Sequence, residues 1–330
     1  MTASKDAKTV GFIDLFCGAG LFSAGFARAG MRPLLALDLD EHAIASYRRN
    51  VSDVAVVGCT EDYSLARKAD VLLAGPPCQG FSTLGRRDPA DTRNRLCMVI
   101  PKWAELSEAR VVVVENVPPF LQSSHWSTMR DALVGQGFTI EVWVLNAANF
   151  GAPQLRLRAF TVASKVGPIG EPTPSTEMIP AAQAFAPVRA GDPMHVWPKP
   201  SQLALERFEM IPEFGDKRDV LRAAPDRCPP SWHRLGTKEA TDVWGRVDPR
   251  RPANTLRCRF QNASTGRYIH PSENRVLSIR EGARLQGVSD EWVFEGHRKS
   301  IARQVGNGVP VPLAHAVAQR IMETLQKNDL

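Results

Sequence analysis

Residues 74–84 read Ala-Gly-Pro-Pro-Cys-Gln-Gly-Phe-Ser-Thr-Leu and directly follow the apolar run Val71–Ala74. A short apolar run that ends in a turn signal predicts a buried β-strand. The two prolines fix φ and remove two backbone donors, so this turn is stiff and presents the Cys78 thiol in one direction. The alternative is an inert buried cysteine, which is how most free cysteines behave.

A second stretch, residues 111–119, reads Val-Val-Val-Val-Glu-Asn-Val-Pro-Pro. The four valines predict another buried strand, which ends at Glu115. Ligands of open α/β sheets bind at the carboxyl ends of the strands. We therefore expect Cys78 and Glu115 to lie at the same edge of one sheet.

A glycine turn follows the first apolar run of the chain. Residues 10–16 predict a strand, residues 17–20 read Cys-Gly-Ala-Gly, and a helical pattern runs from Leu21 to Ala29. Gly18 and Gly20 let the backbone approach a ligand closely, while the helix N-terminus offers unpaired amides. A dinucleotide-binding fingerprint requires glycine at position 23, where this chain has Ser23, so a nucleotide-dependent oxidoreductase is disfavoured.

Two acidic residues mark the end of the second predicted strand, residues 33–39: Asp38 is its last-but-one residue and Asp40 follows it directly. An acidic side chain about twenty residues after a glycine turn can accept hydrogen bonds from ribose hydroxyls, and Asp38 is our choice for that role. Asp40 is better placed to cap the helix that begins at Glu41.

Two further stretches are rich in arginine. Residues 80–95 have almost no apolar content and predict a basic loop, either a lid over a phosphate backbone or a solvated loop. In residues 149–164, Gln154, Arg156 and Arg158 alternate, so an extended run would place all three on one face. A surface edge strand is the alternative for that stretch.

Composition limits the class of protein. The 330 residues can form one large domain, or a large and a small one, and the net charge of +6 suits a polyanionic partner. Six cysteines without a C-x-x-C pair predict neither a disulfide framework nor a metal site, and they fit a reducing cytosol. The apolar runs are of strand length, so we expect no membrane segment.

The later part of the chain differs in amino-acid composition. Prolines interrupt residues 165–200, which predicts a domain boundary. Basic residues outnumber acidic ones in residues 217–259, and the aromatic and basic side chains there predict a nucleic-acid face: Trp232, His233, Trp244, Arg246, Arg257 and Arg259.

Regular structure is predicted again near the C-terminus. Ser278 and Glu281 have the spacing of a capping box that opens a short helix. The last predicted helix has one apolar stripe, formed by Leu313, Val317, Ile321 and Leu325. Such a stripe requires a partner surface, and we expect this helix to pack against the first domain.

These motifs, in this order, resemble the DNA (cytosine-5)-methyltransferase family of bacterial type. The resemblance runs from about Val10 to Ile321, except for roughly residues 165–245, and it is carried by Asp14-Leu-Phe-Cys-Gly-Ala-Gly, Asp38-Leu-Asp, Gly75-Pro-Pro-Cys-Gln, Glu115-Asn-Val, Gln154-Leu-Arg-Leu-Arg, Arg251-Pro-Ala-Asn-Thr and Gly306-Asn-Gly-Val-Pro. The chain departs from the family at Leu21, where a second consecutive glycine is common, and at Cys59, where an Asp reads the adenine amine.

The resemblance implies a Rossmann-like α/β sheet that binds S-adenosylmethionine, with a smaller inserted target-recognition domain. We expect a catalytic and cofactor-binding domain at 1–164, the target-recognition domain at 165–250 and a C-terminal segment at 251–330 that returns to the catalytic domain. The cofactor contacts that it implies are Phe16, Gly18, Gly20, Asp38, Leu39, Gly75, Pro76, Asn307 and Val309.

The resemblance also implies the chemistry. Cys78 would add to carbon 6 of a flipped-out cytosine, Glu115 would hold ring nitrogen 3 and the exocyclic amine, and Arg158 would bind the carbonyl oxygen. Arg156 and Gln154 complete the expected catalytic set. The expected partner is double-stranded DNA, and we expect neither a metal nor a membrane contact. A cognate restriction endonuclease is a candidate protein partner. We expect the enzyme to be a monomer in the bacterial cytoplasm, at the nucleoid.

Three alternatives remain open at this point. One is the oxidoreductase that Ser23 disfavours. Another is an RNA methyltransferase, whose tRNA-acting branch typically continues Pro-Pro-Cys-Gln with Pro-Phe, whereas Gly80-Phe81-Ser82 follows here. The third is a catalytically silent DNA-binding relative.

Overall fold

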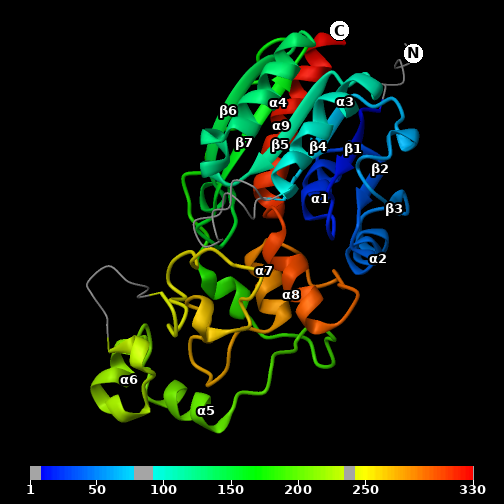
Figure 1. The fold of residues 1–330 in the computed structure, drawn as a ribbon. Coiled ribbons are helices and arrows are strands. Elements are labelled where there is room, and N and C mark those ends of the chain that lie inside the picture. The colour runs from blue at the N-terminus through cyan, green and yellow to red at the C-terminus, as the bar shows by residue number, and fades with distance from the viewer. Residues whose placement is uncertain (1–8, 78–91, 234–241, 330) are drawn as a thin grey trace. The chain divides into compact units, whose positions relative to one another are not determined.

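The computed structural model describes residues 9–77, 92–233 and 242–329. The chain forms two compact units (Figure 1). The first is built from the described residues within Met1–Asn146, Leu157–Pro174 and Val311–Leu330, and the second from those within Ala147–Arg156 and Ser175–Pro310. Residues 251–310 therefore belong to the second unit.

The first unit is built on one mixed β-sheet. Within the described residues, seven strands form it in the order β3-β2-β1-β4-β5-β7-β6. The strands β1 to β5 run parallel, while β7 is antiparallel to both β5 and β6. The strands are β1 (Gly11–Leu15), β2 (Arg32–Asp38), β3 (Ala55–Val57), β4 (Val71–Ala74), β5 (Val111–Asn116), β6 (Thr139–Asn146) and β7 (Leu157–Ser164).

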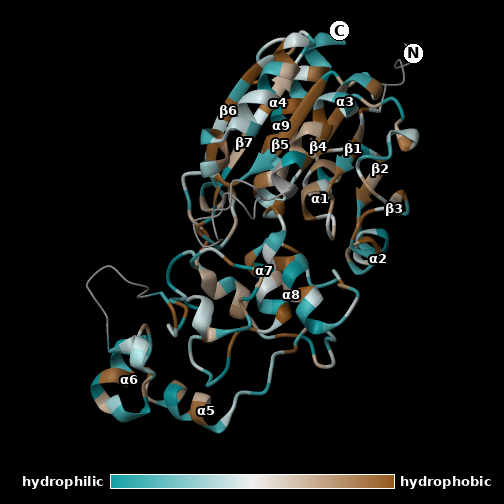
Figure 2. Cartoon of the chain, viewed as in Figure 1, coloured by the Kyte–Doolittle hydropathy of each residue, from teal (hydrophilic) through white to brown (hydrophobic). Residues whose placement is uncertain are grey.

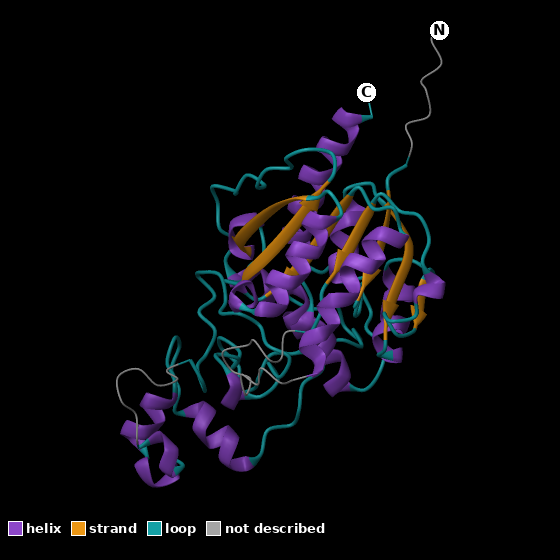
Figure 3. Cartoon of the chain, turned by 45° about the horizontal axis from the view of Figure 1, so that its top comes forward, coloured by secondary structure: helices purple, strands orange, loops and turns teal. Residues whose placement is uncertain are grey.

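Helices cover both faces of this sheet (Figure 3). Ile13 and Leu15 of β1 pack with the helices that follow β4 and β5, whereas Phe12 faces the opposite side and contacts Phe26. This alternation buries both faces and explains why β4 and the first four residues of β5 are apolar (Figure 2). The helices are α1 (Leu21–Arg28), α2 (Glu41–Asn50), α3 (Val99–Leu106), α4 (Ser124–Gly135) and α9 (Val311–Asn328).

The last helix confirms its predicted role. Leu313, Val317, Ile321 and Leu325 of α9 are completely buried. In the first unit α9 packs against α1, where His315 Nδ1 lies 3.3 Å from the Gly25 carbonyl oxygen, and Arg320 donates to the Ile169 carbonyl. Among the described helices, none has both the length and the apolar content needed to cross a bilayer.

The second unit contains short helices joined by irregular chain. Its helices are α5 (Gln202–Glu209), α6 (Lys217–Ala223), α7 (Ile279–Leu285) and α8 (Arg298–Asn307). The predicted capping box at the start of α7 is confirmed, because Ser278 accepts from the Glu281 amide while the Glu281 carboxylate accepts from the Ser278 amide.

The predicted nucleic-acid face in residues 217–259 is wrong at several positions. Trp232 and Trp244 are buried in an apolar core with Phe208. Arg246 is 5% exposed and donates to the carbonyls of Phe208, Ile211, His270 and Glu273. Its guanidinium is therefore committed to holding loops together and is not available to read bases.

Candidate active site

The carboxyl ends of β4 and β5 lie side by side in parallel register, with Ala74 paired to Val114. The segment that follows β4 is fastened to the segment that ends β5, because Asn116 Nδ2 donates to the Pro76 carbonyl at 3.2 Å. Asn116 belongs to the Glu-Asn-Val motif, but the sequence alone suggested no role for it. Cys78 and the basic loop up to residue 91 lie outside the described residues.

Glu115 and Arg158 form the centre of the described site. Arg158, the second residue of β7, approaches the end of β5, and its Nε lies 2.7 Å from Glu115 Oε1. The side chains are only 11% and 14% exposed, so the ion pair is weakly screened by water. The structure thus brings together the two side chains that we expected to hold a cytosine ring.

Gln154 and Arg156 lie elsewhere in the fold, because β7 begins only at Leu157 and the residues before it belong to the second unit. Gln154 Nε2 donates to the Leu285 carbonyl at 2.7 Å and to Gln286 Oε1 at 2.8 Å. Arg156 donates to the carbonyls of Leu256 and Gly306. The three alternating polar groups are therefore not on one face of a strand, and a catalytic role for these two residues stays a prediction.

The glycine turn between β1 and α1 has an unusual backbone. Phe16 has φ 61°, Gly18 φ 53° and Gly20 φ 89°. A non-glycine residue in the left-handed region costs energy and is a feature of functional turns. Gly20 precedes α1 without any side-chain cap, so the first amides of the helix are left for another acceptor.

Packing also requires glycine at position 20. A Cβ at this position would lie 2.7 Å from Tyr47 Cδ2 of α2. The Tyr47 ring therefore supports the turn directly, and no larger residue fits at position 20 without displacing it.

Asp38 connects β2 to this turn. Its Oδ2 accepts from the Gly18 amide at 2.9 Å and its Oδ1 from the Asp40 amide at 2.9 Å. Burial is the largest cause that raises the pKa of Asp38 above its ordinary value. Asp40 caps α2, as predicted, by accepting from the amides of His42 and Ala43. Leu39 is 71% exposed, which leaves an apolar surface beside the turn.

The C-terminal motif lies in the second unit. Cys258 Sγ donates to Asn307 Oδ1 at 2.6 Å, and Val309 is buried. Gly306 packs directly on the backbone of Arg257 and Cys258, so a Cβ there would collide with it. Gly306 thus fixes the start of the segment that carries Asn307 and Val309.

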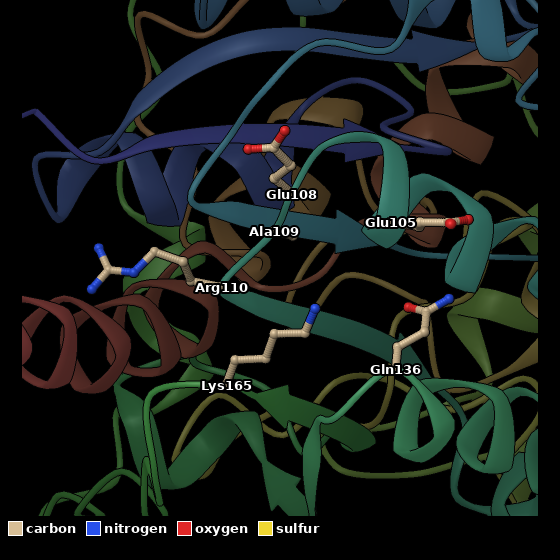
Figure 4. Close-up of a pocket in the computed structure, with 6 residues that line it drawn as sticks. All are labelled: Glu105, Glu108, Ala109, Arg110, Gln136 and Lys165. Carbon is tan, nitrogen blue, oxygen red and sulfur yellow. The ribbon is translucent and has the colours of Figure 1, made fainter.

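A hollow lined by Glu105, Glu108, Ala109, Arg110, Gln136 and Lys165 holds none of the predicted site residues (Figure 4). It lies at the amino end of β5, the opposite end from Glu115. Its charges have partners, since Glu108 pairs with Lys68, and Arg110 with Asp329. Across the part of the chain that the structure describes, no group of His, Cys, Asp and Glu could hold a metal ion.

Residues 10–323 match the family described as C-5 cytosine-specific DNA methylase. The chain belongs to this family. It is 32% identical to the Type II methyltransferase M1.HphI of Haemophilus parahaemolyticus, over 94% of this chain and 86% of that protein. It is 30% identical to the Type II methyltransferase M.DdeI of Desulfomicrobium norvegicum, over 94% of this chain and 88% of that protein.

Solved structures agree on the fold. A prophage-encoded protein of E. coli superposes with a TM-score of 0.69 at 23% identity, covering 96% of this chain and 99% of that one. The Entamoeba histolytica methyltransferase EhMeth gives a TM-score of 0.68 at 16% identity, covering 98% and 100%. The predicted α/β methyltransferase fold is confirmed.

The protein is an S-adenosylmethionine-dependent methyltransferase, and the glycine turn fits this cofactor. The uncapped amides at the N-terminus of α1 suit a carboxylate, and each Asp38 oxygen keeps a lone pair that could accept from a ribose hydroxyl. The bound cofactor supplies an electrophilic methyl group.

Proposed function

We propose that this enzyme methylates carbon 5 of cytosine in a specific sequence of duplex DNA, as a bacterial Type II modification enzyme. The observation that carries the proposal is the ion pair of Glu115 at the carboxyl end of β5 with Arg158 at the amino end of the antiparallel strand β7, beside the segment that leads to Cys78. The names of the family and of its curated relatives favour DNA over the RNA alternative.

Each residue would act on the ring in turn. The Cys78 thiolate adds to carbon 6, which makes carbon 5 nucleophilic. Glu115 offsets the charge that develops on the ring by sharing a proton with nitrogen 3, while Arg158 binds the carbonyl oxygen and holds Glu115 in place. After methylation, loss of the carbon 5 proton releases the thiolate. The base must leave the duplex to reach this site.

We assign sequence recognition to residues 165–250 and phosphate contacts to the basic loop of residues 80–95. Arginines that stay exposed in α6 and beyond, such as Arg222 and Arg259, are better candidates for DNA contacts than Arg246. A chromosomal substrate would place the enzyme in the bacterial cytoplasm at the nucleoid, and a cognate restriction endonuclease remains a proposed partner.

Bisulfite sequencing of DNA from a host without its own cytosine methylation tests the proposal. Expression of this chain should protect cytosines in one short sequence, and Cys78→Ser should abolish that protection. Unmethylated DNA together with methylated host tRNA would favour the RNA alternative.

A further inference from the structure

The strand that enters the glycine turn carries a buried carboxylate to which neither sequence nor chemistry has assigned a role. Asp14 is the fourth residue of β1 and is 1% exposed. Its Oδ2 accepts from Ser23 Oγ of α1 at 2.6 Å, and Ser23 Oγ in turn accepts from the Tyr47 hydroxyl of α2 at 2.8 Å. Asp14 Oδ1 has no hydrogen-bond partner among the described residues.

This chain of contacts supports the cofactor turn from below. Asp14 precedes the turn by two residues, Ser23 lies in the helix that follows it, and the Tyr47 ring lies against Gly20. Ser23 therefore links Asp14 to Tyr47 in this fold, in addition to departing from the dinucleotide fingerprint.

The charges around Asp14 are of one sign. Asp38, on the neighbouring strand, is the acidic group close enough to raise the pKa of Asp14 by repulsion, and it binds the Gly18 amide of the same turn. In the described chain, no Lys, Arg or His forms an ion pair with either carboxylate. A buried carboxylate without a cation is costly, and a cationic ligand nearby reduces that cost.

S-adenosylmethionine and its product differ in the charge that such a site detects. The sulfonium gives the cofactor one positive charge more than S-adenosylhomocysteine, a neutral thioether with the same adenosine and amino acid groups. We propose that Asp14 is a specificity-determining residue that favours the cationic cofactor over its spent product, and that this preference grows as Asp14 ionises.

The pH range follows from the surroundings of Asp14. Burial, opposed by the Ser23 hydrogen bond and reinforced by Asp38, raises its pKa to about 7. Cys17 in the turn and Tyr47 on α2 also interact electrostatically with Asp14, while His315 of α9 lies against the Gly25 carbonyl of α1. Burial raises the pKa values of the thiol and the phenol, so both stay neutral here. As pH rises through about 7, Asp14 gains its charge and S-adenosylmethionine should bind more tightly.

Calorimetry of the whole protein with each ligand between pH 6 and pH 8 tests this inference. We expect S-adenosylmethionine affinity to rise about three- to tenfold across the range, as for a pKa displaced by half to one unit on binding, with a smaller change for S-adenosylhomocysteine. In Asp14→Asn, which keeps the shape, the difference between the ligands should disappear. The α-amino group that both ligands share titrates in the same range, so the comparison of wild type with variant isolates Asp14.

Two more variants keep the test decisive if Asp14→Asn folds poorly. Ser23→Ala removes the hydrogen bond that lowers the pKa of Asp14, so the midpoint should move to higher pH. Tyr47→Phe keeps the ring beneath Gly20 and leaves the carboxylate bonded to Ser23, so it should retain the preference. Equal pH dependence for both ligands in wild type, or a preference that survives in Asp14→Asn, would overturn the proposal. Failure of wild type to bind S-adenosylmethionine at any pH would instead contradict the cofactor assignment.

Discussion

The guanidinium of Arg158 and the carboxylate of Glu115 meet at 2.7 Å across two antiparallel strands, β5 and β7. The register pairs Glu115 with Phe160, so Arg158 reaches along the sheet from two residues away. Because each side chain orients the other, a change at either one should disturb the substrate contacts of both.

Replacing Glu115 by Gln should lower the rate of methyl transfer by about 10²- to 10⁴-fold, the usual contribution of a positioned acid or base. Binding of S-adenosylmethionine should be nearly unchanged, because the glycine turn does not involve Glu115. Single-turnover transfer of a tritiated methyl group measures the effect. Glu105→Gln, at an exposed position on α3, is the matched control; a similar loss in both variants would contradict the assignment.

Substitutions of Asp38 and Asp40 should have different effects, the first on cofactor affinity and the second on stability. Asp38→Ala removes the acceptor of the Gly18 amide and should weaken S-adenosylmethionine by about 1–3 kcal/mol. Asp40→Ala removes the cap of α2 and should cost about 1 kcal/mol of stability with little effect on affinity. Calorimetry measures the cofactor affinity of both variants, and denaturant unfolding measures their stability. A larger loss of affinity in Asp40→Ala than in Asp38→Ala would assign the ribose contact to Asp40.

Arg246 should stabilise the second unit without choosing the DNA sequence. Arg246→Gln leaves several buried carbonyls without a donor and should cost about 3 kcal/mol or more. The sequence methylated by the remaining folded protein should not change. Arg222→Gln, at a position where the side chain is 75% exposed, is the comparison. A changed methylation sequence in Arg246→Gln would show that Arg246 takes part in DNA sequence recognition after all.

The buried pair of Asp192 and Arg280 predicts acid sensitivity of the second unit. Burial alone would raise the pKa of Asp192, but the Arg280 guanidinium at 2.6 Å and the Met194 amide outweigh it and lower that pKa. A carboxylate with a lowered folded pKa contributes stability above its ordinary value near 3.8, and this contribution is lost as pH falls through the folded pKa.

Asp192→Asn should therefore cost about 3 kcal/mol at neutral pH, because the buried Arg280 keeps only backbone carbonyls and the Asp290 carboxylate 3.9 Å away. The difference from wild type should shrink as the pH falls below about 4, where Asp192 loses its charge in both the unfolded and the folded protein. Urea unfolding across this pH range measures both effects. A difference that stays constant with pH would show that the pair is not the cause.

Patterns of local origin were predictable from the sequence. The apolar runs of β4 and β5, the Asp40 cap, the capping box of α7 and the stripe of α9 depend on residues close in the chain, and all are confirmed. The Glu115 and Arg158 contact was expected only because both residues stand in motifs of a known family.

Other features depend on tertiary partners that no local pattern contains. Alternation suggested a strand through Gln154 and Arg156. Their side chains donate hydrogen bonds to backbone carbonyls and to the Gln286 side-chain amide, at least 100 residues away in the sequence, and these contacts keep the segment out of the sheet. Arg246 looked like a DNA contact because composition cannot reveal burial. Asp14 and Ser23 likewise gained a meaning only when β1, α1 and α2 were brought together.

The central claim is that Cys78 attacks cytosine in DNA, and a trapping experiment tests it most directly. DNA amplified from bacterial genomic fragments with 5-fluorodeoxycytidine triphosphate contains many short sequences, and fluorine prevents loss of the proton at carbon 5. With S-adenosylmethionine, we predict a denaturant-stable protein–DNA adduct whose peptide map places the link at Cys78, and none without the cofactor. An adduct at Cys17, Cys59 or Cys97, or one formed only with fluorinated RNA, would contradict the account.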